Sequence, residues 1–424
     1  MITLIKGGYV LNPATGLEGV YDVLVKDDVV AEIAPEIIAE AHRVIDAAGK
    51  YVMPGFIDLH QHLREPGFEY KETIATGAMA AAVGGFTTIC PMPNTKPVID
   101  SKAMVEYLNY KAEAESPINI IPVGAVTVGQ MGETLADIKG MAEAGALALS
   151  EDGKSVMNPL LYKEGLKRAA EAGLVMLAHC EDKGLLAGGV MNAGAKAEEL
   201  GMPGITNSVE DVITARDIIL AKETGVKLHL CHCSTADSVA LVRMGKEIGA
   251  KVSAEVCPHH FAMTEDEIPG DDANYKMNPP LRSKADVAAL IQGLKDGTME
   301  VIATDHAPHS AEEKKKSIKD APFGIVGSET AFALSMTALV KPGHLTPMQL
   351  VEKLSYNPAR VIGIDKGDIA PGKIADIVIA DPDAEYTIDV NTFVSKGKNS
   401  PFHGKRVTGR VLLTMVNGEV VYEY

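Results

Sequence analysis

The sequence has no tryptophan and little cysteine. Its 424 residues include five cysteines, an odd number, and no two of them form a C-x-x-C pair. This count disfavours both a disulfide framework and a zinc ribbon. Free cysteines behave as small apolar residues and are commonly buried. We therefore expect five reduced packing residues, at Cys90, Cys180, Cys231, Cys233 and Cys257.

Long apolar runs and an excess of positive charge are also missing. No stretch approaches the roughly 18 apolar residues that cross a bilayer. The N-terminal MITLIKGGYVLNPATG turns polar too soon for the core of a signal peptide. The formal net charge of −17 argues against nucleic acid or an anionic membrane as a partner. We expect a cytoplasmic protein whose partner is a small molecule, with monomer and homodimer both left open.

What the sequence does contain is a regular alternation of short apolar runs with helical patterns. Eight runs follow residue 51, namely VMPGFID, GFTTIC, NIIPVGAV, GALALSED, LVMLAH, VKLHLCH, KVSAEVC and EVIATD. Eight strands separated by helices predict an α/β fold of the (β/α)8 TIM-barrel type. A doubly wound open sheet is the alternative, but no strand leads into a G-x-G-x-x-G turn.

Short β-rich pieces also occur at the two ends of the chain. They predict one small β-sheet domain built from both termini, because each piece alone has few strands. We assign residues 1–53 to the N-terminal part of this domain and residues 366–424 to its C-terminal part. Residues 54–365 then form the barrel.

The first barrel strand runs into GFIDLHQHLREPG, which contains His60 and His62. Side chains alternate along a strand, so these two imidazoles point the same way and could share one metal ion. Alone, such a pair is more often two surface histidines. However, barrel active sites lie at the C-terminal ends of the strands, and four further ends carry ligand-type residues: Asp152, His179, His232 and Asp305.

Four histidines and two carboxylates exceed the needs of one catalytic zinc, which takes three protein ligands. They suit two metal ions about 3.5–4 Å apart, bridged by a carboxylate and a hydroxide. Mixed histidine and carboxylate ligation points to zinc first, with cobalt and manganese left open. We therefore predict two Zn²⁺ ions per chain.

Several motifs carry a family resemblance. HQHLREPG, PMPNT at 91–95, TDHAPH at strand eight and the closing NPARVIGIDKGDIAPGKIADIVIAD resemble the amidohydrolase superfamily, and within it the class I bacterial dihydroorotases. The resemblance covers essentially the whole chain. It implies the reversible cyclisation of N-carbamoyl-L-aspartate to L-dihydroorotate in pyrimidine (UMP) biosynthesis. A hydantoinase- or allantoinase-like cyclic amidohydrolase and a metal-free scaffold are the alternatives.

The resemblance also implies a role for each site residue. His60, His62 and Asp305 would bind one metal ion, His179 and His232 would bind the second, and Asp152 would bridge the two. Many relatives bridge their metals with a carboxylated lysine instead. GALALSED contains no lysine, and Lys154 lies past the strand end, so we expect none here.

The substrate-binding residues are likewise implied by the resemblance. The substrate carboxylate would be held by Arg64, Asn94 and His309, and His62 would also contact the substrate. Asn278 and the backbone at Phe323 and Gly324 would meet the ring amide groups. From the chemistry itself, Asp305 touches a metal and faces the site, so it can accept and return the proton in an amide hydrolysis. Arg64 supplies a planar fork suited to a carboxylate.

Other interpretations of these residues stay open. Arg64 could form an ion pair with Glu65 or Asp58, and Asn94 could merely cap a turn. The charged segment from His309 to Phe323 could be a mobile lid.

The remaining polar residues near the strand ends have several interpretations. Asp58 could orient a metal ligand. His229 lies three positions before His232, so we expect it to face away and pack in the core. We expect His259 and His260 to lie in a loop, and His306 either to bond a ligand carboxylate or to pack.

Overall fold

A ring of parallel strands forms the centre of the computed structural model, which describes residues 1–424. One part of the ring has the order β6-β7-β8 and the other the order β16-β15-β14-β11-β10-β9. The strands are β6 (Phe56–Gln61), β7 (Phe86–Pro91), β8 (Asn119–Ile120), β9 (Val123–Ala125), β10 (Ala148–Ser150), β11 (Val175–Ala178), β14 (Lys227–Leu230), β15 (Val252–Val256) and β16 (Val301–Ile302).

Two connections close this ring. β8 and β9 come from the single predicted run NIIPVGAV, so they join the two parts on one side. On the other side, a parallel bridge pairs Gln61 with His306, and the His62 backbone N–H donates to the His306 carbonyl at 2.9 Å. Counting β8 and β9 as one, eight parallel strands surround the centre. The predicted barrel is confirmed.

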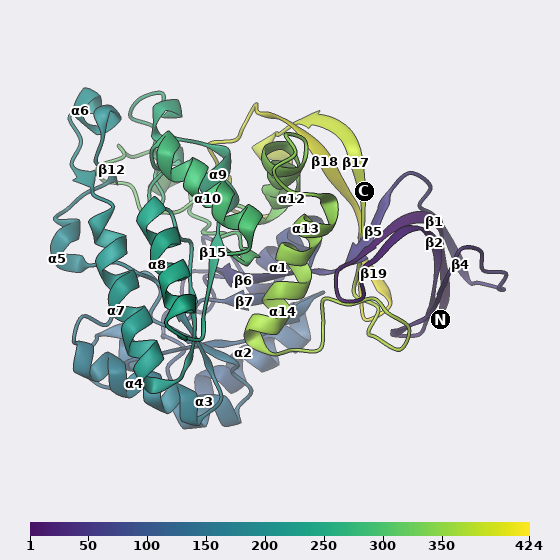
Figure 1. The fold of residues 1–424 in the computed structure, drawn as a ribbon, viewed down its shortest axis with the longest axis horizontal. Helices are drawn as coiled ribbons and strands as arrows, with labels where there is room; N and C mark the ends of the chain where they lie inside the picture. The colour runs from purple at the N-terminus through teal and green to yellow at the C-terminus, as the bar shows by residue number, and fades with distance from the viewer.

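Helices cover the outside of the barrel (Figure 1). The α-helices of the whole chain are α1 (Ile74–Val83), α2 (Lys102–Glu115), α3 (Ile138–Glu143), α4 (Pro159–Glu171), α5 (Lys183–Leu186), α6 (Ala195–Leu200), α7 (Ser208–Thr224), α8 (Ala236–Glu247), α9 (Pro258–Ala262), α10 (Lys284–Asp296), α11 (Ala311–Lys314), α12 (Ala331–Ser335), α13 (Pro347–Val351) and α14 (Asn357–Ile362). Local sequence explains several starts. The side chains of Thr73, Thr235 and Ser283 cap α1, α8 and α10 by accepting from backbone N–H groups. A small pair, β12 (Met191–Asn192) with β13 (Gly204–Ile205), lies between α5 and α7.

Strands from both chain ends form one further sheet, on the side of the molecule where both termini lie (Figure 1). Its order is β19-β18-β17-β5-β1-β2-β3, with β4 paired to β1. These strands are β1 (Ile2–Asn12), β2 (Leu17–Lys26), β3 (Val29–Ala34), β4 (Arg43–Asp46), β5 (Tyr51–Pro54), β17 (Ile377–Thr387), β18 (Arg406–Val416) and β19 (Glu419–Glu423). The small sheet domain from both termini is therefore confirmed. The domain boundaries stay a prediction.

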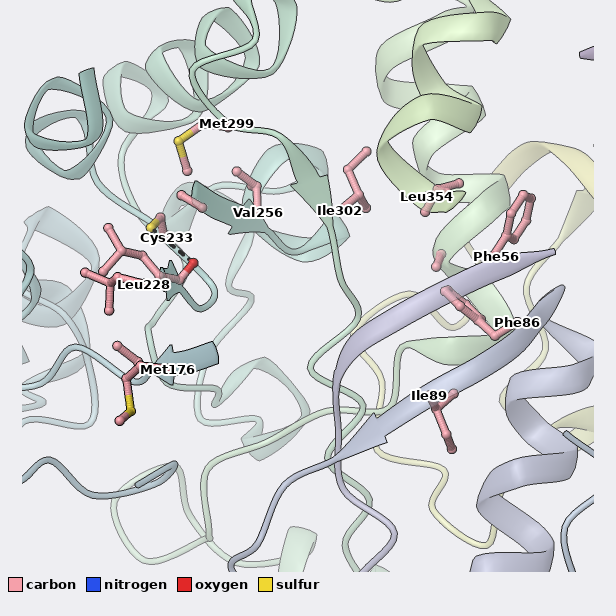
Figure 2. Close-up of a cluster of buried hydrophobic side chains, with 14 of the residues drawn as sticks. Phe56, Phe86, Ile89, Met176, Leu228, Cys233, Val256, Met299, Ile302 and Leu354 are labelled. Atoms are coloured by element: carbon pink, nitrogen blue, oxygen red, sulfur yellow. Dashed lines mark hydrogen bonds between the residues drawn. The ribbon is translucent and has the colours of Figure 1, made fainter. Parts of the chain in front are cut away.

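The sheet and the barrel meet without a linker. Only Gly55 separates β5 from β6, and a Cβ at that position would lie 2.1 Å from Thr87 Oγ1. Phe56 belongs to the largest apolar cluster (Figure 2). Its ring stacks on that of Phe332, with the ring centroids 5.6 Å apart. Close packing of this kind stabilises the fold by removing apolar surface from water. It also fixes the base of β6, the strand that leads to His60.

The cysteines and the helices bear on two expectations from the sequence. All five cysteines are buried and free, as expected for packing residues. None of the helices is both long and apolar enough to cross a membrane.

Candidate active site

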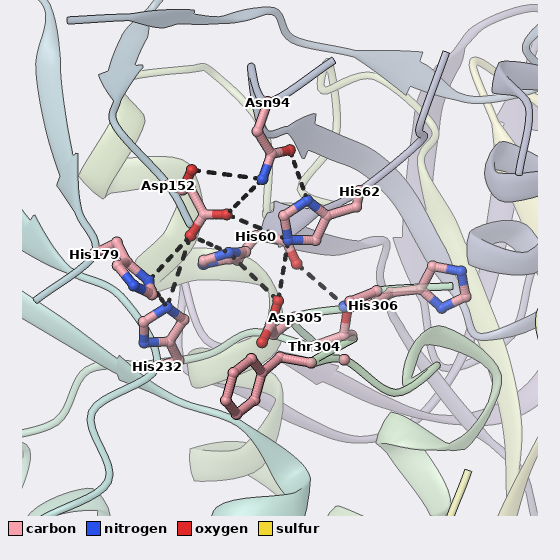
Figure 3. A network of polar contacts seen from close by, with 12 residues as sticks. His60, His62, Asn94, Asp152, His179, His232, Thr304, Asp305 and His306 are labelled. Atoms are coloured by element: carbon pink, nitrogen blue, oxygen red, sulfur yellow. Dashed lines mark hydrogen bonds and ion pairs between the residues drawn. The ribbon is translucent and has the colours of Figure 1, made fainter. Parts of the chain in front are cut away.

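Six predicted ligands come together at the C-terminal ends of the barrel strands (Figure 3). In the first half of this cluster, the Oδ1 atom of Asp305 lies 3.2 Å from His62 Nε2 and 3.5 Å from His60 Nε2. Asp152 closes this group, with Oδ1 at 3.2 Å from His60 Nε2 and Oδ2 at 3.4 Å from His62 Nε2. Two imidazoles and two carboxylates thus surround one small space.

The second half of the cluster shares Asp152. Its Oδ1 atom lies 3.4 Å from His179 Nδ1 and 3.7 Å from His232 Nε2, and these two nitrogens are 2.9 Å apart. Asp152 is the one carboxylate that reaches all four histidines. Its position between the two halves is the position that a bridging ligand requires.

The donor set fits divalent metal ions. All six side chains are buried, and His60 Nε2 makes no hydrogen bond. Burial alone would raise the pKa of Asp152, but His60 and the hydrogen bonds of His179 and His232 hold it well below its ordinary value. A carboxylate that stays ionised among four imidazoles creates a buried site that attracts positive charge. Imidazole and carboxylate donors of this kind are typical of zinc sites.

No lysine takes part in this cluster. Lys154 directs its Nζ atom to the carbonyl of Gln130 at 3.1 Å. Glu151, which precedes Asp152, accepts from the backbone N–H groups of Val126 and Thr127 at 3.0 and 3.1 Å. Glu151 therefore anchors the neighbouring strand end and leaves Asp152 to the cluster.

Glu255 on β15 is a site residue that the sequence analysis missed. Its Oε1 atom lies 3.1 Å from His60 Nδ1 and accepts from the backbone N–H of His232 at 3.1 Å. Its Oε2 atom lies 2.9 Å from His229 Nε2. Both Glu255 and His229 are fully buried. A carboxylate on the far nitrogen of a metal-ligating histidine fixes the ring orientation and raises the basicity of the ligand.

The contacts of Glu255 correct one part of our expectation for His229, which is buried as expected but does not face away from the site. We expected it to face away from the site because it lies three positions before His232. Instead, His229 shares the carboxylate that holds His60. The alternation fails because the backbone of His232 is left-handed, with φ of 35°. Side chains alternate between the two faces only while the strand conformation continues.

Asp58 acts on the backbone of the site. Its carboxylate accepts from the N–H and the hydroxyl of Thr304 at 3.0 and 2.5 Å, and from the His60 N–H at 3.2 Å. Burial raises the pKa of Asp58 to about 6 in spite of these bonds. Asp58 thus supports the turn that carries Asp305, and the orienting partner of the His60 ring is Glu255.

Asn94 joins the two halves of the cluster. Its Oδ1 atom lies 3.0 Å from His62 Nδ1, and its Nδ2 atom donates to Asp152 Oδ2 at 3.2 Å. These contacts show more than a turn cap, and they place Asn94 against a predicted ligand on each side. Its predicted contact with the substrate carboxylate stays a proposal.

Arg64 forms no ion pair in the structure. Glu65 instead binds Lys111 at 3.1 Å, and Asp58 binds Thr304. The Arg64 Nε atom donates to the Pro308 carbonyl at 3.2 Å, and its Nη2 atom lies 3.3 Å from His309 Nε2. A partly buried guanidinium without a carboxylate partner is suited to a ligand that brings one.

His309 links Arg64 to the segment predicted to bind the ring amide. Its Nε2 atom lies 2.8 Å from the Phe323 carbonyl, and its Nδ1 atom lies 3.2 Å from Lys71 Nζ. Burial, followed by the nearby charges of Arg64 and Lys71, lowers the pKa of His309 to about 2. The ring is therefore neutral and donates from Nε2. It would have to exchange this bond to bind a substrate carboxylate.

The other predicted amide-binding residues lie nearby. Asn278 donates from Nδ2 to Glu181, and this carboxylate lies 3.9 Å from His179 Nε2. Gly324 has a φ of 133°, and a Cβ there would lie 2.7 Å from Ala307 Cβ and 3.1 Å from His309 Nε2. Only glycine fits this position without strain.

Three further histidines lie outside the six-residue cluster. The His306 ring points away from it (Figure 3), with Nε2 at 3.5 Å from Glu72. We expected His259 and His260 to be in a loop, but both are buried in the one-turn helix α9. His260 Nε2 contacts the Pro279 carbonyl at 2.9 Å.

Comparison with known proteins agrees with this geometry. Residues 49–238 match the family described as dihydro-orotase-like. The chain is 49% identical over 418 residues to the dihydroorotase of Acetivibrio thermocellus, covering 99% of this chain and 98% of the relative. It is 50% identical over 423 residues to the dihydroorotase of Pelotomaculum thermopropionicum, covering 100% and 99% of the two chains. The chain belongs to the dihydroorotase family.

The fold is shared more widely than the sequence. The L-hydantoinase (dihydropyrimidinase) of Arthrobacter aurescens superposes with a TM-score of 0.89 over 99% of this chain and 96% of its own, at 30% identity. Both families are therefore built on a barrel with a sheet from the two termini. This chain is a cyclic amidohydrolase, and the higher identity places it with the dihydroorotases.

Proposed function

We propose that this dihydroorotase interconverts N-carbamoyl-L-aspartate and L-dihydroorotate at a site that holds two zinc ions. His60, His62 and Asp305 would hold one ion, His179 and His232 the other, and Asp152 both. When bound, the ions would activate a water molecule and polarise the carbonyl under attack. The six converging donors and the buried His60 Nε2 atom without a hydrogen bond support this assignment.

Asp305 is suited to move the proton. Both of its contacts with His60 and His62 use Oδ1, which leaves Oδ2 to exchange a proton with the reactants. In hydrolysis, this carboxylate would accept a proton from the attacking water and return it to the departing ring nitrogen. In ring closure, it would take the proton of the ureido nitrogen as that nitrogen attacks the side-chain carboxylate. The acid then gives this proton to the departing carboxylate oxygen, which leaves as hydroxide and takes a second proton from solvent.

The unpaired guanidinium of Arg64 is the observation that favours dihydroorotate as the substrate. Dihydroorotate has a ring carboxylate, whereas hydantoins and dihydropyrimidines need not have one. The guanidinium lies beside His309 without any carboxylate of this chain to neutralise it. A bidentate bond to the substrate carboxylate would supply the missing charge and a fixed orientation.

The test compares two substrates in Arg64→Met. Hydrogen bonds to charged groups contribute about 1.5–3 kcal/mol each, so loss of a bidentate contact should lower kcat/KM for dihydroorotate about 10²-fold or more. Arg64→Lys should recover only part of this loss, because lysine brings the charge without the fork.

An uncharged dihydropyrimidine, if turned over, should be nearly indifferent to Arg64→Met. Metal content must remain that of the wild type in both variants. Equal losses on the two substrates would show that Arg64 supports the structure of the site and does not bind the substrate carboxylate. A hydantoinase-like specificity would then be favoured.

A further inference from the structure

Lys314 is a buried lysine in the segment that we expected to be a mobile lid. It ends the one-turn helix α11, and only 7% of the residue is exposed. Its Nζ atom donates to the carbonyls of Gly324 at 2.9 Å, Pro322 at 3.1 Å and Lys276 at 3.2 Å. An ammonium group has three protons to donate. All three are therefore used, and each is used on backbone.

The three carbonyls belong to the two segments proposed to bind the ring amide. Lys276 lies two residues before Asn278, and Gly324 is itself one of the proposed contacts. The same segments also bond one another, because the Gly324 N–H donates to the Lys276 carbonyl at 3.0 Å. Lys314 thus cross-links the backbone on both sides of the proposed amide site.

The other side of α11 is fastened as well. Glu313 binds Lys71 Nζ at 2.9 Å and accepts from the Tyr70 hydroxyl at 3.2 Å. Ser310 caps the helix by accepting from the Glu313 N–H at 3.3 Å. Two neighbouring residues of this helical turn therefore contact opposite sides of the site. Glu313 binds the loop that follows Arg64, and Lys314 binds the segments proposed to contact the ring amide.

Burial of this lysine is costly, and no carboxylate forms an ion pair with it, although Asp272 and Glu313 lie near enough to favour its charge. Burying a charge without a counter-ion lowers the stability of a fold. Burial, followed by the charge of Lys276, lowers the pKa of Lys314 to about 7. An apolar side chain of similar length would fill the same space without this cost. What it could not supply is three convergent hydrogen-bond donors.

We propose that Lys314 is a positioning residue for substrate recognition, whose ammonium group fixes the backbone at Phe323 and Gly324 against the segment that carries Asn278. The proposal rests on the proposed function, because that function assigns the ring amide to these groups. The hydrogen bonds of the Lys314 ammonium group all go to backbone carbonyls, and none goes to a predicted metal ligand or to Arg64, Asn94 or His309.

The test compares Lys314→Met with Lys315→Met. Lys315 follows in sequence, but its side chain is 71% exposed and pairs with Glu312 at 3.2 Å. In Lys314→Met we expect KM for dihydroorotate to rise about tenfold or more, since charged hydrogen bonds are lost. We expect kcat to change less and the metal content to stay at the wild-type value. The Gly324 amide should exchange its hydrogen faster. Lys315→Met should leave all four quantities unchanged.

A second variant keeps the proposal testable if Lys314→Met does not fold. Lys314→Gln retains two donor protons, so it should show intermediate exchange at Gly324 and an intermediate KM. Wild-type KM and wild-type Gly324 exchange in either folded variant would overturn the proposal. If the wild-type protein does not turn over dihydroorotate, the proposed function fails. The exchange rate at Gly324 would still report whether Lys314 positions this backbone.

Discussion

Replacing Glu255 with glutamine should weaken metal binding, although Glu255 is not itself a proposed ligand. The Glu255 carboxylate is fully buried and contacts His60 Nδ1 at 3.1 Å, the His232 N–H at 3.1 Å and His229 Nε2 at 2.9 Å. When His60 binds a metal through Nε2, its Nδ1 atom carries the ring proton and donates a hydrogen bond to Glu255. Glutamine has nearly the same shape but presents a donor where one of these contacts needs an acceptor.

The size of the effect follows from these contacts. Loss of a carboxylate partner on a metal-ligating histidine typically costs 10–100-fold in metal affinity or activity. This range equals about 1.4–2.7 kcal/mol at 1.36 kcal/mol per tenfold change, in line with one hydrogen bond to a charged group. His60 belongs to one half of the cluster and His232 to the other. We therefore expect Glu255→Gln to weaken zinc binding in both halves of the cluster.

The assay is a titration of metal-free protein with zinc in the presence of a competing chelator. Glu72→Gln is the matched control, because Glu72 is also fully buried and faces a histidine, His306, at 3.5 Å. This histidine lies outside the six-residue cluster. The control should lower the melting temperature and leave zinc affinity unchanged. Unaltered zinc affinity in Glu255→Gln, or an equal loss in Glu72→Gln, would refute the role given to Glu255.

Two further variants test the bridge and the amide site. Asp152→Ala should reduce bound metal from two ions to at most one, whereas Glu151→Gln, which changes only the neighbouring anchor, should retain two by metal analysis. Gly324→Ala should lose about 1–3 kcal/mol of stability from strain at positive φ and should also raise KM, because the new Cβ would press on Ala307 and His309. Gly297→Ala is its control: the φ there is 79°, no atom lies within 4 Å of the new Cβ, and only the melting temperature should fall. A wild-type KM in Gly324→Ala would remove Gly324 from the substrate site.

The barrel and its metal cluster could be predicted because both depend on local pattern. Each strand is a short apolar run, and a barrel gathers the C-terminal ends of its strands at one face. Asp152, His179 and Asp305 could therefore be placed together without any knowledge of packing. The strand order of the terminal sheet could not, since β5 pairs with β17 from the far end of the chain. Such pairings are decided by contacts between residues hundreds of positions apart.

The supporting residues were harder to predict. Glu255 lies inside the apolar run KVSAEVC, which predicts a buried strand. A carboxylate buried in such a strand needs a partner, and this was the signal that could have identified Glu255 as a site residue. Lys314 is the first lysine of EEKKK, and nothing local separates it from Lys315, which is exposed. Only the packed structure shows that one of them turns inward to three carbonyls.

The strained turns explain why two buried carboxylates, Asp58 and Glu255, stand beneath the cluster. His232 and Asp305 have left-handed backbones, with φ of 35° and 46°, a conformation that costs energy for residues other than glycine. Each turn is held by hydrogen bonds that a regular strand end would not provide. Glu255 accepts from the His232 N–H, and Asp58 accepts from the N–H and hydroxyl of Thr304, next to Asp305.

Such anchors allow a barrel strand to end and still aim its next side chain inward. Without them, His232 and Asp305 would relax toward ordinary backbone angles, and their side chains would leave the cluster. Asp58 and Glu255 are therefore as much a part of the active site as the six predicted metal ligands. Their conversion to alanine should disperse the cluster even though all six ligands remain in the sequence.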